Sequence, residues 1–236
     1  MCWSFGASTV LAILGVTASF ILYKSKKYHE LWISLFYFSI MELLQAVTYL
    51  VLNRCSLPLN QIFTVLGYFH IAFQPFFINR AFMFFIPEEV KQKISGGVYS
   101  ICFIGALLTL AQLIPFTFAG MCRQGVDVLC GTNICSASGS WHLAWFLPLN
   151  GLAILTFFGY TIPAFILPLI YGAWKPTTYH IILGPLLAWL LSPNPNEFPA
   201  TWCLFSIAFI LAVFYKPLLN RMYTKKWYFW NYPTKK

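Results

Sequence analysis

The sequence predicts an all-α integral membrane protein, a bundle of about seven transmembrane helices with its N-terminus outside and its C-terminus inside. The composition, the spacing of the apolar runs and the distribution of basic residues support this fold class. Of the 236 residues, 59% are hydrophobic and only 9% are charged, whereas a soluble domain carries roughly 25% charged residues. So few charges cannot cover the surface of a soluble domain, so we expect most of the chain to lie in a bilayer.

Seven apolar runs are candidates for membrane helices, which need about 20 mainly apolar residues and satisfy their backbone hydrogen bonds internally. They cover residues 5–23, 31–52, 61–86, 97–119, 143–174, 178–191 and 200–215. The fifth run contains Pro148, Pro163 and Pro168, which predicts a kinked or tilted helix. The sixth is short and contains Gly184-Pro185. The alternating strands of about ten residues that a transmembrane β-barrel requires are absent from the sequence.

The basic residues predict the orientation. With the N-terminus outside, Arg54 and Arg123 fall on the outer side and the other basic residues, of 15 in all, fall inside. This bias follows the positive-inside rule. An eighth helix, made by splitting the fifth run near Gly159, would move the basic tail outside. Because the first run is followed rather than preceded by lysines, starting at Lys24, its polarity is opposite to that of a cleaved signal peptide, and we expect it to be retained.

The domain organisation is simple. Residues 1–215 are expected to form one transmembrane domain, and residues 216–236 a basic aromatic tail at the membrane interface. In the tail, lysines and arginines alternate with Trp227, Tyr228, Trp230 and Tyr232, a mixture that suits the headgroup zone. The expected partners are the bilayer and anionic headgroups of the inner leaflet, which attract about 1 kcal/mol per nearby basic residue. We therefore attribute the net charge of +9 to orientation in the membrane and not to nucleic acid.

Most of the cysteines fall on one side of the predicted membrane. Cys102 lies near the inner end of the fourth helix, and the others lie at or near the outer face: Cys2, Cys55, Cys122, Cys130, Cys135 and Cys203. This distribution indicates an oxidising compartment with up to three disulfides, whose pairing the sequence leaves open. The disulfide candidates are Cys55, Cys122, Cys130, Cys135 and Cys203, and at least one bridge is expected in the polar loop 122–135.

Free thiols and a zinc site are the alternatives for these cysteines. The spacing Cys130-x4-Cys135 lacks a tight zinc knuckle, and the nearest histidine is His142. A zinc site of three histidines is also disfavoured, because the predicted topology puts His29 and His180 inside, His142 outside and only His70 near the centre. We therefore predict no metal and no cofactor.

Polar residues at membrane depth are the candidate functional residues. Glu42 lies about 11 residues into the second run, which places it about 16 Å from the inner boundary at 1.5 Å per residue. The third helix runs the opposite way, so His70 reaches a similar depth. Gln45 shares a helix face with Glu42, and Gln74 shares one with His70. We expect Glu42, Gln45, His70 and Gln74 to form a polar seam between the second and third helices.

Two interpretations of this seam remain open. A carboxylate near the bilayer centre costs at least about 2.5 kcal/mol, so Glu42 must face the bundle, be protonated or have a partner. The functional interpretation is a proton-sensitive or ion-binding site on a transport or ligand pathway, with His142 and Glu197 at the outer face as candidate entrance residues. The structural interpretation is hydrogen bonding between helices, worth about 0.6 kcal/mol per bond.

The sequence lacks familiar catalytic patterns. No G-x-S-x-G, H-E-x-x-H or P-loop motif occurs, and the seventh run has no lysine before Lys216 to hold retinal. The catalytic residues are therefore unknown, and the sequence favours a protein that is not an enzyme.

The opening Met1-Cys2-Trp3-Ser4 resembles a functionally uncharacterised family of multi-pass membrane proteins. Further stretches are similar to that family: Glu42-x2-Gln45, His70-x3-Gln74-Pro75-x3-Asn79, Trp141-His142, His180-x3-Gly184-Pro185 and Pro199-Ala200-Thr201-Trp202-Cys203. The resemblance covers most of the chain and implies one domain, but it supplies no activity.

Three functions follow as hypotheses. The first is a small channel or transporter for protons, ions or small solutes that uses the midplane seam. The second is an intramembrane enzyme acting on lipid, with His70 or His142 beside Glu42 or Glu197. The third is a structural or accessory subunit of a membrane complex, or a homo-oligomer. A bacterial inner membrane and a eukaryotic secretory membrane both fit the charge and cysteine pattern.

Overall fold

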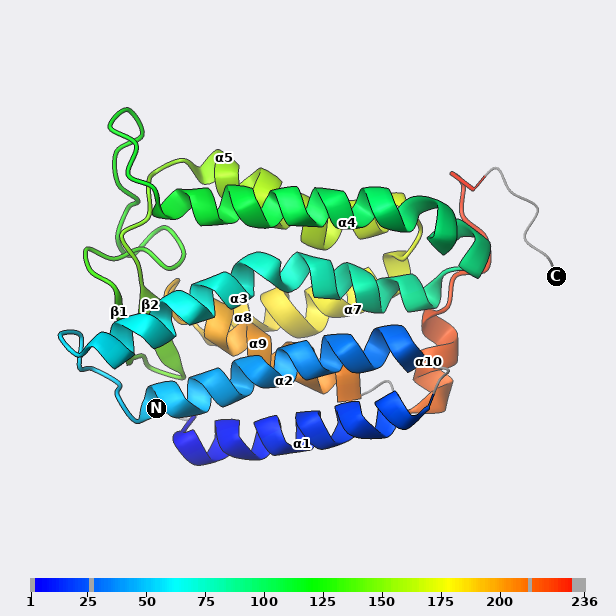
Figure 1. Cartoon of the computed structure of the whole chain (residues 1–236), viewed down its shortest axis with the longest axis horizontal. Coiled ribbons are helices and arrows are strands. Elements are labelled where there is room, and N and C mark those ends of the chain that lie inside the picture. Colours follow the sequence, from blue (N-terminus) through cyan, green and yellow to red (C-terminus); the bar gives the residue numbers. More distant parts are fainter. Residues whose placement is uncertain (1–2, 26–27, 212–213, 231–236) are drawn as a thin grey trace.

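The structure, a computed structural model, describes residues 3–25, 28–211 and 214–230. Long helices lie side by side along the longest axis of the molecule (Figure 1). The single helices are α1 (Phe5–Lys24), α2 (His29–Tyr49), α3 (Pro58–Phe82), α4 (Glu88–Leu110), α9 (Phe198–Leu211) and α10 (Lys216–Met222). Short 3₁₀ turns, η2 (Met83–Phe85) and η3 (Ala111–Leu113), extend α3 and α4.

Two further helices each consist of three consecutive segments. The first joins α5 (Ala153–Thr156), the π-helix η4 (Phe157–Ile166) and α6 (Leu167–Ile170). The second joins α7 (Trp174–Ile181), the π-helix η5 (Ile182–Leu186) and α8 (Leu187–Leu191). Each π-helix contains a proline, Pro163 or Pro185. A proline removes an N–H donor from the helix, and the wider π turn, which is rare, occurs mostly as a local bulge inside an α-helix.

The chain is mostly helical, and within the described ranges five helices are long and apolar enough to cross a membrane. By length and composition these are Phe5–Lys24, Glu30–Tyr49, Pro58–Phe85, Glu88–Leu113 and Ala153–Ile170. The first three agree with the predicted helices at 5–23, 31–52 and 61–86 to within a few residues.

The predicted fourth helix, at 97–119, is displaced toward the N-terminus. The helix begins at Glu88 and ends with η3 at Leu113. The first turn of this helix is charged, so hydropathy alone did not indicate where the helix begins. Glu88 and Glu89 in that turn are favoured by the positive end of the helix dipole.

The predicted fifth helix, at 143–174, begins too early. Residues Leu143–Phe146 form strand β2, which pairs antiparallel with β1 (Cys135–Ser138), and the helix begins only at Ala153. The strand is apolar because it is buried: Leu143, Ala144 and Trp145 are at most 1% exposed. A short buried strand and a buried helix cannot be told apart by hydropathy alone. The all-α prediction is therefore corrected to a mostly helical fold with one small hairpin.

The two ends of the bundle differ in character. The N-terminus, the hairpin and the longest loops gather at one end, called the cap end here, and α10 lies at the opposite end (Figure 1). At that opposite end Trp227 Nε1 donates to the carbonyl of Ile170 at 2.9 Å, and Trp230 Nε1 donates to that of Tyr171 at 3.2 Å. The described part of the basic aromatic tail therefore packs on the protein as well as carrying charge.

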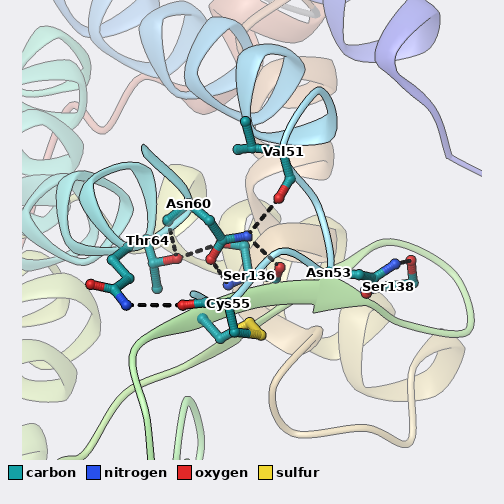
Figure 2. The surroundings of a disulfide bond; sticks show 9 residues. Val51, Asn53, Cys55, Asn60, Thr64, Ser136 and Ser138 are labelled. Carbon is teal, nitrogen blue, oxygen red and sulfur yellow. Dashed lines mark hydrogen bonds between the residues drawn. A yellow bond between two sulfur atoms is a disulfide. The ribbon is translucent and has the colours of Figure 1, made fainter. Parts of the chain in front are cut away.

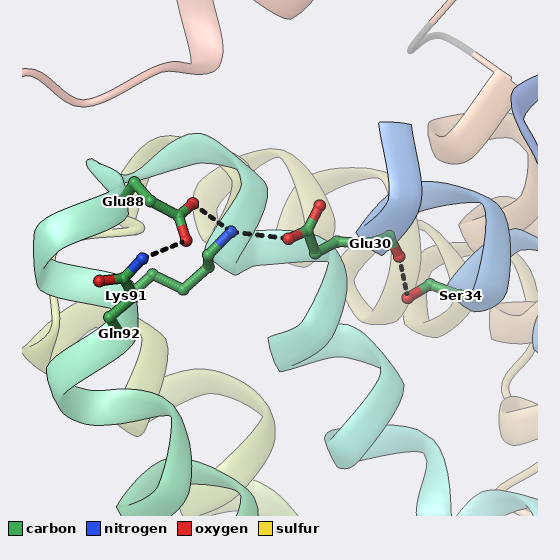
Figure 3. A network of polar contacts seen from close by, with 5 residues as sticks. All are labelled: Glu30, Ser34, Glu88, Lys91 and Gln92. Atoms are coloured by element: carbon green, nitrogen blue, oxygen red, sulfur yellow. Dashed lines mark hydrogen bonds and ion pairs between the residues drawn. The ribbon is translucent and has the colours of Figure 1, made fainter. Parts of the chain in front are cut away.

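An ion-pair network also lies at this opposite end (Figure 3). Lys91 of α4 pairs with Glu30 of α2 at 2.7 Å and with Glu88 one turn away. The Ser34 hydroxyl donates to the carbonyl of Phe77 at 2.8 Å. These contacts tie α2, α3 and α4 together, although partly exposed ion pairs contribute only about 0–1 kcal/mol each.

Two disulfides hold the cap end, Cys55–Cys135 and Cys122–Cys130. Four of the five disulfide candidates are therefore confirmed. The prediction for Cys203 is wrong, because this residue is buried in α9, outside both disulfides, and its sulfur accepts a hydrogen bond from Gln74. Cys2 lies outside the described residues.

Asn60 anchors the hairpin to the start of α3 (Figure 2). Its Nδ2 donates to the carbonyls of Val51 at 2.9 Å and Ser136 at 2.8 Å, and its Oδ1 accepts from the Ser136 N–H at 2.9 Å. The Thr64 and Ser136 hydroxyls lie 2.7 Å apart. Because Asn60 is fully buried, no solvent can replace these bonds.

We expect Asn60→Ala to lower the free energy of unfolding by about 2–4 kcal/mol, because it leaves buried backbone groups unpaired. Asn53→Gly is the control: Asn53 also binds the hairpin, at Ser138, but is exposed, and glycine adopts its positive φ of 64° without strain, so we expect a loss below about 1 kcal/mol. Chemical unfolding in detergent micelles measures both variants. Equal losses would contradict the anchoring role of Asn60.

Candidate functional site

A cavity of about 500 Å³ extends from the cap end into the helices. Cys122 and Asp127 of the disulfide-closed loop line its outer part, and Gln74 of α3 and Tyr160 of η4 lie among its lining residues at helix depth. Aromatic side chains, including Phe165 of η4, contribute much of the wall. The loop is held over the cavity by its disulfide and by the ion pair of Arg123 with Asp127, at 3.0 Å.

Gln74 connects this cavity to the interior of the bundle. Its Oε1 accepts a hydrogen bond from the Tyr160 hydroxyl at 2.7 Å, and its Nε2 donates to the Cys203 sulfur at 3.0 Å. Gln74 is only 4% exposed. Both ends of its amide are therefore used to join α3, η4 and α9.

Glu42 lies behind this connection, within electrostatic range of Cys203. The Glu42 side chain is fully buried, and neither carboxyl oxygen has a hydrogen-bond partner in the described protein. The Ser8 hydroxyl of α1 lies next to the carboxyl, without a hydrogen bond of standard geometry. Glu42, Cys203, Gln74 and Tyr160 thus form a buried cluster, named the midplane cluster, contributed by four helices.

Gln45 and His70, the other two residues of the predicted seam, are placed differently. Gln45 is fully buried on α2, and neither end of its amide has a partner. The His70 ring stacks on Tyr37 with centroids 3.8 Å apart, and the Tyr37 hydroxyl donates to the His70 carbonyl at 2.5 Å. No hydrogen bond or ion pair joins His70 to Glu42 within the described residues. Glu42 lies within electrostatic range of Cys203, which accepts the hydrogen bond from Gln74, whereas His70 lies beside Tyr37.

Glu197, one of the two candidate entrance residues, is fully buried in the cap end. Its carboxylate accepts from three consecutive backbone N–H groups, those of Ser140, Trp141 and His142, at 2.5, 2.8 and 3.0 Å. It lies just before the N-terminus of α9, which begins at Phe198 and where a negative charge is favoured. The carboxylate therefore anchors the hairpin turn.

His142, the other candidate entrance residue, lies in that turn and is 2% exposed. Its Nδ1 accepts from the Leu143 N–H at 2.8 Å and lies 3.4 Å from the Tyr49 hydroxyl. Its ring stacks on Trp3 with centroids 5.7 Å apart. Burial lowers the pKa of His142 to about 3, because the protonated ring would lose its hydration.

The sequence did not identify Tyr160 and Cys203 as members of the midplane cluster. Tyr160 lies in a long apolar run, where nothing distinguishes it from other aromatic residues. Cys203 was assigned to the outer face, but it follows the start of α9 at Phe198 by more than one turn. That depth was a usable signal that it lies inside the bundle. Within the described residues, no group of three His, Cys, Asp or Glu side chains is arranged to hold a metal ion.

Comparison with protein families gives one match, to a family of unknown function (DUF5765), over residues 6–223. The match covers nearly the whole chain, so the protein belongs to this family. Comparison with curated proteins and with solved structures gives no significant match.

We expect the protein to lose stability below pH 6.5 because of His142. Its pKa is 6.5 when unfolded and about 3 when folded, so the unfolded chain binds more protons between these values. Stability is then complete above pH 6.5 and falls by about 1.4 kcal/mol per unit toward pH 3. At pH 5 the loss is about 2 kcal/mol.

Chemical unfolding of wild type and His142→Gln at pH 7.5 and pH 5 measures this contribution. The variant should lose about 2 kcal/mol less than wild type over this interval. The same pH dependence in both proteins would show that His142 is not kept neutral by burial.

Proposed function

Within this family of unknown function, we propose that the protein is a small membrane transporter that binds a small solute in the cavity and responds to the charge state of Glu42. The observation that carries the proposal is the position of the cavity, which reaches a hydrogen-bonded cluster near a buried carboxyl that has no hydrogen-bond partner of standard geometry among the described residues. An ionisable residue at membrane depth is costly, and such residues commonly mark substrate or ion pathways.

The proposed topology has seven spans, with the N-terminus outside. The joined helix α7–α8 (residues 174–191) and α9 would be the sixth and seventh spans. The joined helix would be about 27 Å long at 1.5 Å per residue, close to the roughly 30 Å of the hydrocarbon core. The positive-inside rule supports this orientation, and so do the disulfides at the cap end, since disulfides persist in oxidising compartments.

The cavity supports solute binding rather than open conduction. Its volume of about 500 Å³ lies within the roughly 300–1,000 Å³ typical of small-molecule sites, which are mostly apolar with a few polar groups. The hydrogen bond between Gln74 and Tyr160 ties α3 to η4 at membrane depth. Passage of a solute beyond this hydrogen bond would need a conformational change, and this requirement favours a transporter over a channel. No lysine or arginine is among the lining residues, which disfavours an anionic solute.

The alternatives receive less support. An enzyme acting on lipid would need an acid and a base within reach of one substrate, but His70 stacks on Tyr37, whereas His142 and Glu197 are engaged in the cap end. An accessory subunit would need a surface for its partner. The exposed apolar side chains of α1, such as Ile13 and Phe20, are equally suited to contact lipid.

We expect liposomes that contain the purified protein to show proton or cation flux above that of empty liposomes. Glu42→Gln should reduce this flux at least tenfold, since a loss of about 1.4 kcal/mol or more in a rate-limiting step has that effect. A pH-sensitive dye and a cation-sensitive dye inside the vesicles measure the flux.

Glu89→Gln is the matched control for this experiment. It makes the same chemical change at an exposed carboxylate of α4, so its flux should equal that of wild type. Absence of flux in both wild type and Glu42→Gln, from protein shown to be folded, would overturn the transport proposal.

A further inference from the structure

Glu42 and Gln45 present unpaired polar atoms on one face of α2. They are three residues apart, a spacing that places side chains on the same helix face with Cβ atoms about 5–6 Å apart. Both side chains are 0% exposed, and neither the two carboxyl oxygens nor the two amide atoms have a hydrogen-bond partner. Four polar atoms on one buried helix face therefore have no hydrogen-bond partner among the residues that the structure describes.

This arrangement differs from that of two other buried amides in the chain, Asn60 and Gln74, and from that of Asn79 and Asn196, each of which lacks a partner only at its oxygen. The Asn60 side chain makes three hydrogen bonds, and both ends of the Gln74 amide are paired. The large majority of buried side-chain polar atoms in proteins have a hydrogen-bond partner, and an unpaired one costs about 1–3 kcal/mol. The pair on α2 is thus poorly explained as interhelical hydrogen bonding.

A third oxygen lies at the same place. The Ser8 hydroxyl of α1 is fully buried and lies next to the Glu42 carboxyl. It accepts a hydrogen bond from Trp3 Nε1 at 2.9 Å, which leaves its oxygen a second lone pair. The close approach of α1 to α2 is made possible by Gly15, because a Cβ at this position would collide with Ser39.

The part of the protein that the structure describes supplies no ion-pair partner for this oxygen cluster. Within the described residues, no lysine or arginine forms an ion pair with Glu42. The ion pairs of Lys91 and Arg123 lie elsewhere, with Glu30 and Glu88 and with Asp127. An uncompensated carboxylate at this depth would be strongly disfavoured.

We infer that Glu42, Gln45 and Ser8 form a binding site for a monovalent alkali cation. One positive charge neutralises the single carboxylate, and carboxylate, amide and hydroxyl oxygens are hard ligands that suit such an ion. A proton would also neutralise Glu42, with its O–H as a donor to a neighbouring oxygen, and the measurements below distinguish it from a cation. A divalent ion would leave one positive charge in a medium of low dielectric. The inference deepens the proposed function, on which it rests, by naming the ion that would couple to transport.

The surroundings connect this site to both the cap end and the cavity. Tyr49 lies one turn beyond Gln45 on α2, within electrostatic range of Glu42, and its hydroxyl lies 3.4 Å from His142 Nδ1. On the other side, Glu42 acts electrostatically on Cys203, which accepts the hydrogen bond from Gln74 at the cavity. A cation bound at this site would therefore change the electrostatic potential at Cys203 and at its hydrogen bond with Gln74.

Cation binding is tested directly by equilibrium thermal unfolding of the full chain in detergent at pH 7.5. NaCl is compared with choline chloride at equal ionic strength. With Na⁺ at roughly ten times its Kd, we expect the unfolding midpoint to rise by about 3–6 °C. Binding of radioactive Na⁺ to the wild-type protein supplies a second measurement that does not depend on any variant.

Glu42→Gln and Gln45→Leu should abolish the Na⁺ response, whereas Glu89→Gln, the matched carboxylate-to-amide control, should retain it. Equal midpoints in NaCl and choline chloride, with no radioactive Na⁺ bound to wild type, would overturn the inference. A Na⁺ response that persists in Glu42→Gln would overturn it as well. Because these measurements need no transport, a protein that binds Na⁺ but shows no flux would contradict the proposed function alone.

Discussion

The pairing of buried polar groups is the constraint on which this structure depends. In a bilayer, backbone N–H and C=O groups must be satisfied by the chain itself, and helices achieve this locally. The irregular backbone between α4 and α5 cannot, and it gathers at the cap end, where Asn60 and Glu197 supply the missing partners. Two disulfides then close the same layer. The cap end in turn supplies the outer wall of the cavity, through Cys122 and Asp127.

Against this background, Glu42 and Gln45 are informative because they break the rule. Other buried polar side chains at helix depth are used: Asn79 Nδ2 donates to the carbonyls of Pro75 and Pro163, each at 2.7 Å. The Oδ1 atoms of Asn79 and Asn196 lack a partner, but on one face of α2 both carboxyl oxygens of Glu42 and both amide atoms of Gln45 lack one among the described residues. Departures from local satisfaction are concentrated at functional sites in proteins.

The sequence predicted much of the helical architecture, because a membrane helix depends on local hydropathy. It also identified Glu42, Gln45 and Gln74 as residues to examine, since polar side chains stand out in apolar runs. The prediction of secondary structure from hydropathy was wrong where an apolar segment is buried by tertiary contacts and not by the membrane. Leu143–Phe146 is as apolar as a helix would be, yet it is a strand beneath the cap.

The predictions for individual side chains depended on distances that a sequence does not contain. Residue counts predicted the depths of Glu42 and His70, but they do not predict the directions of the side chains. The His70 ring in fact stacks on Tyr37. Cys203 was grouped with the outer cysteines, but the compartment in which a cysteine lies predicts a disulfide only statistically. The neighbour of its sulfur is Gln74. Tyr160 carried no signal at all in an apolar run, because its role comes from a single hydrogen bond to a residue of another helix.

The most direct test of the account is the protonation state of Glu42, read by infrared difference spectroscopy of wild type minus Glu42→Gln. If the carboxyl holds a cation, the difference spectrum in Na⁺ at pH 7.5 will contain the bands of an ionised carboxylate. Replacing Na⁺ with choline will convert them to the band of a protonated carboxyl. A protonated carboxyl under both conditions would contradict the account and leave Glu42 as a neutral hydrogen-bonding group.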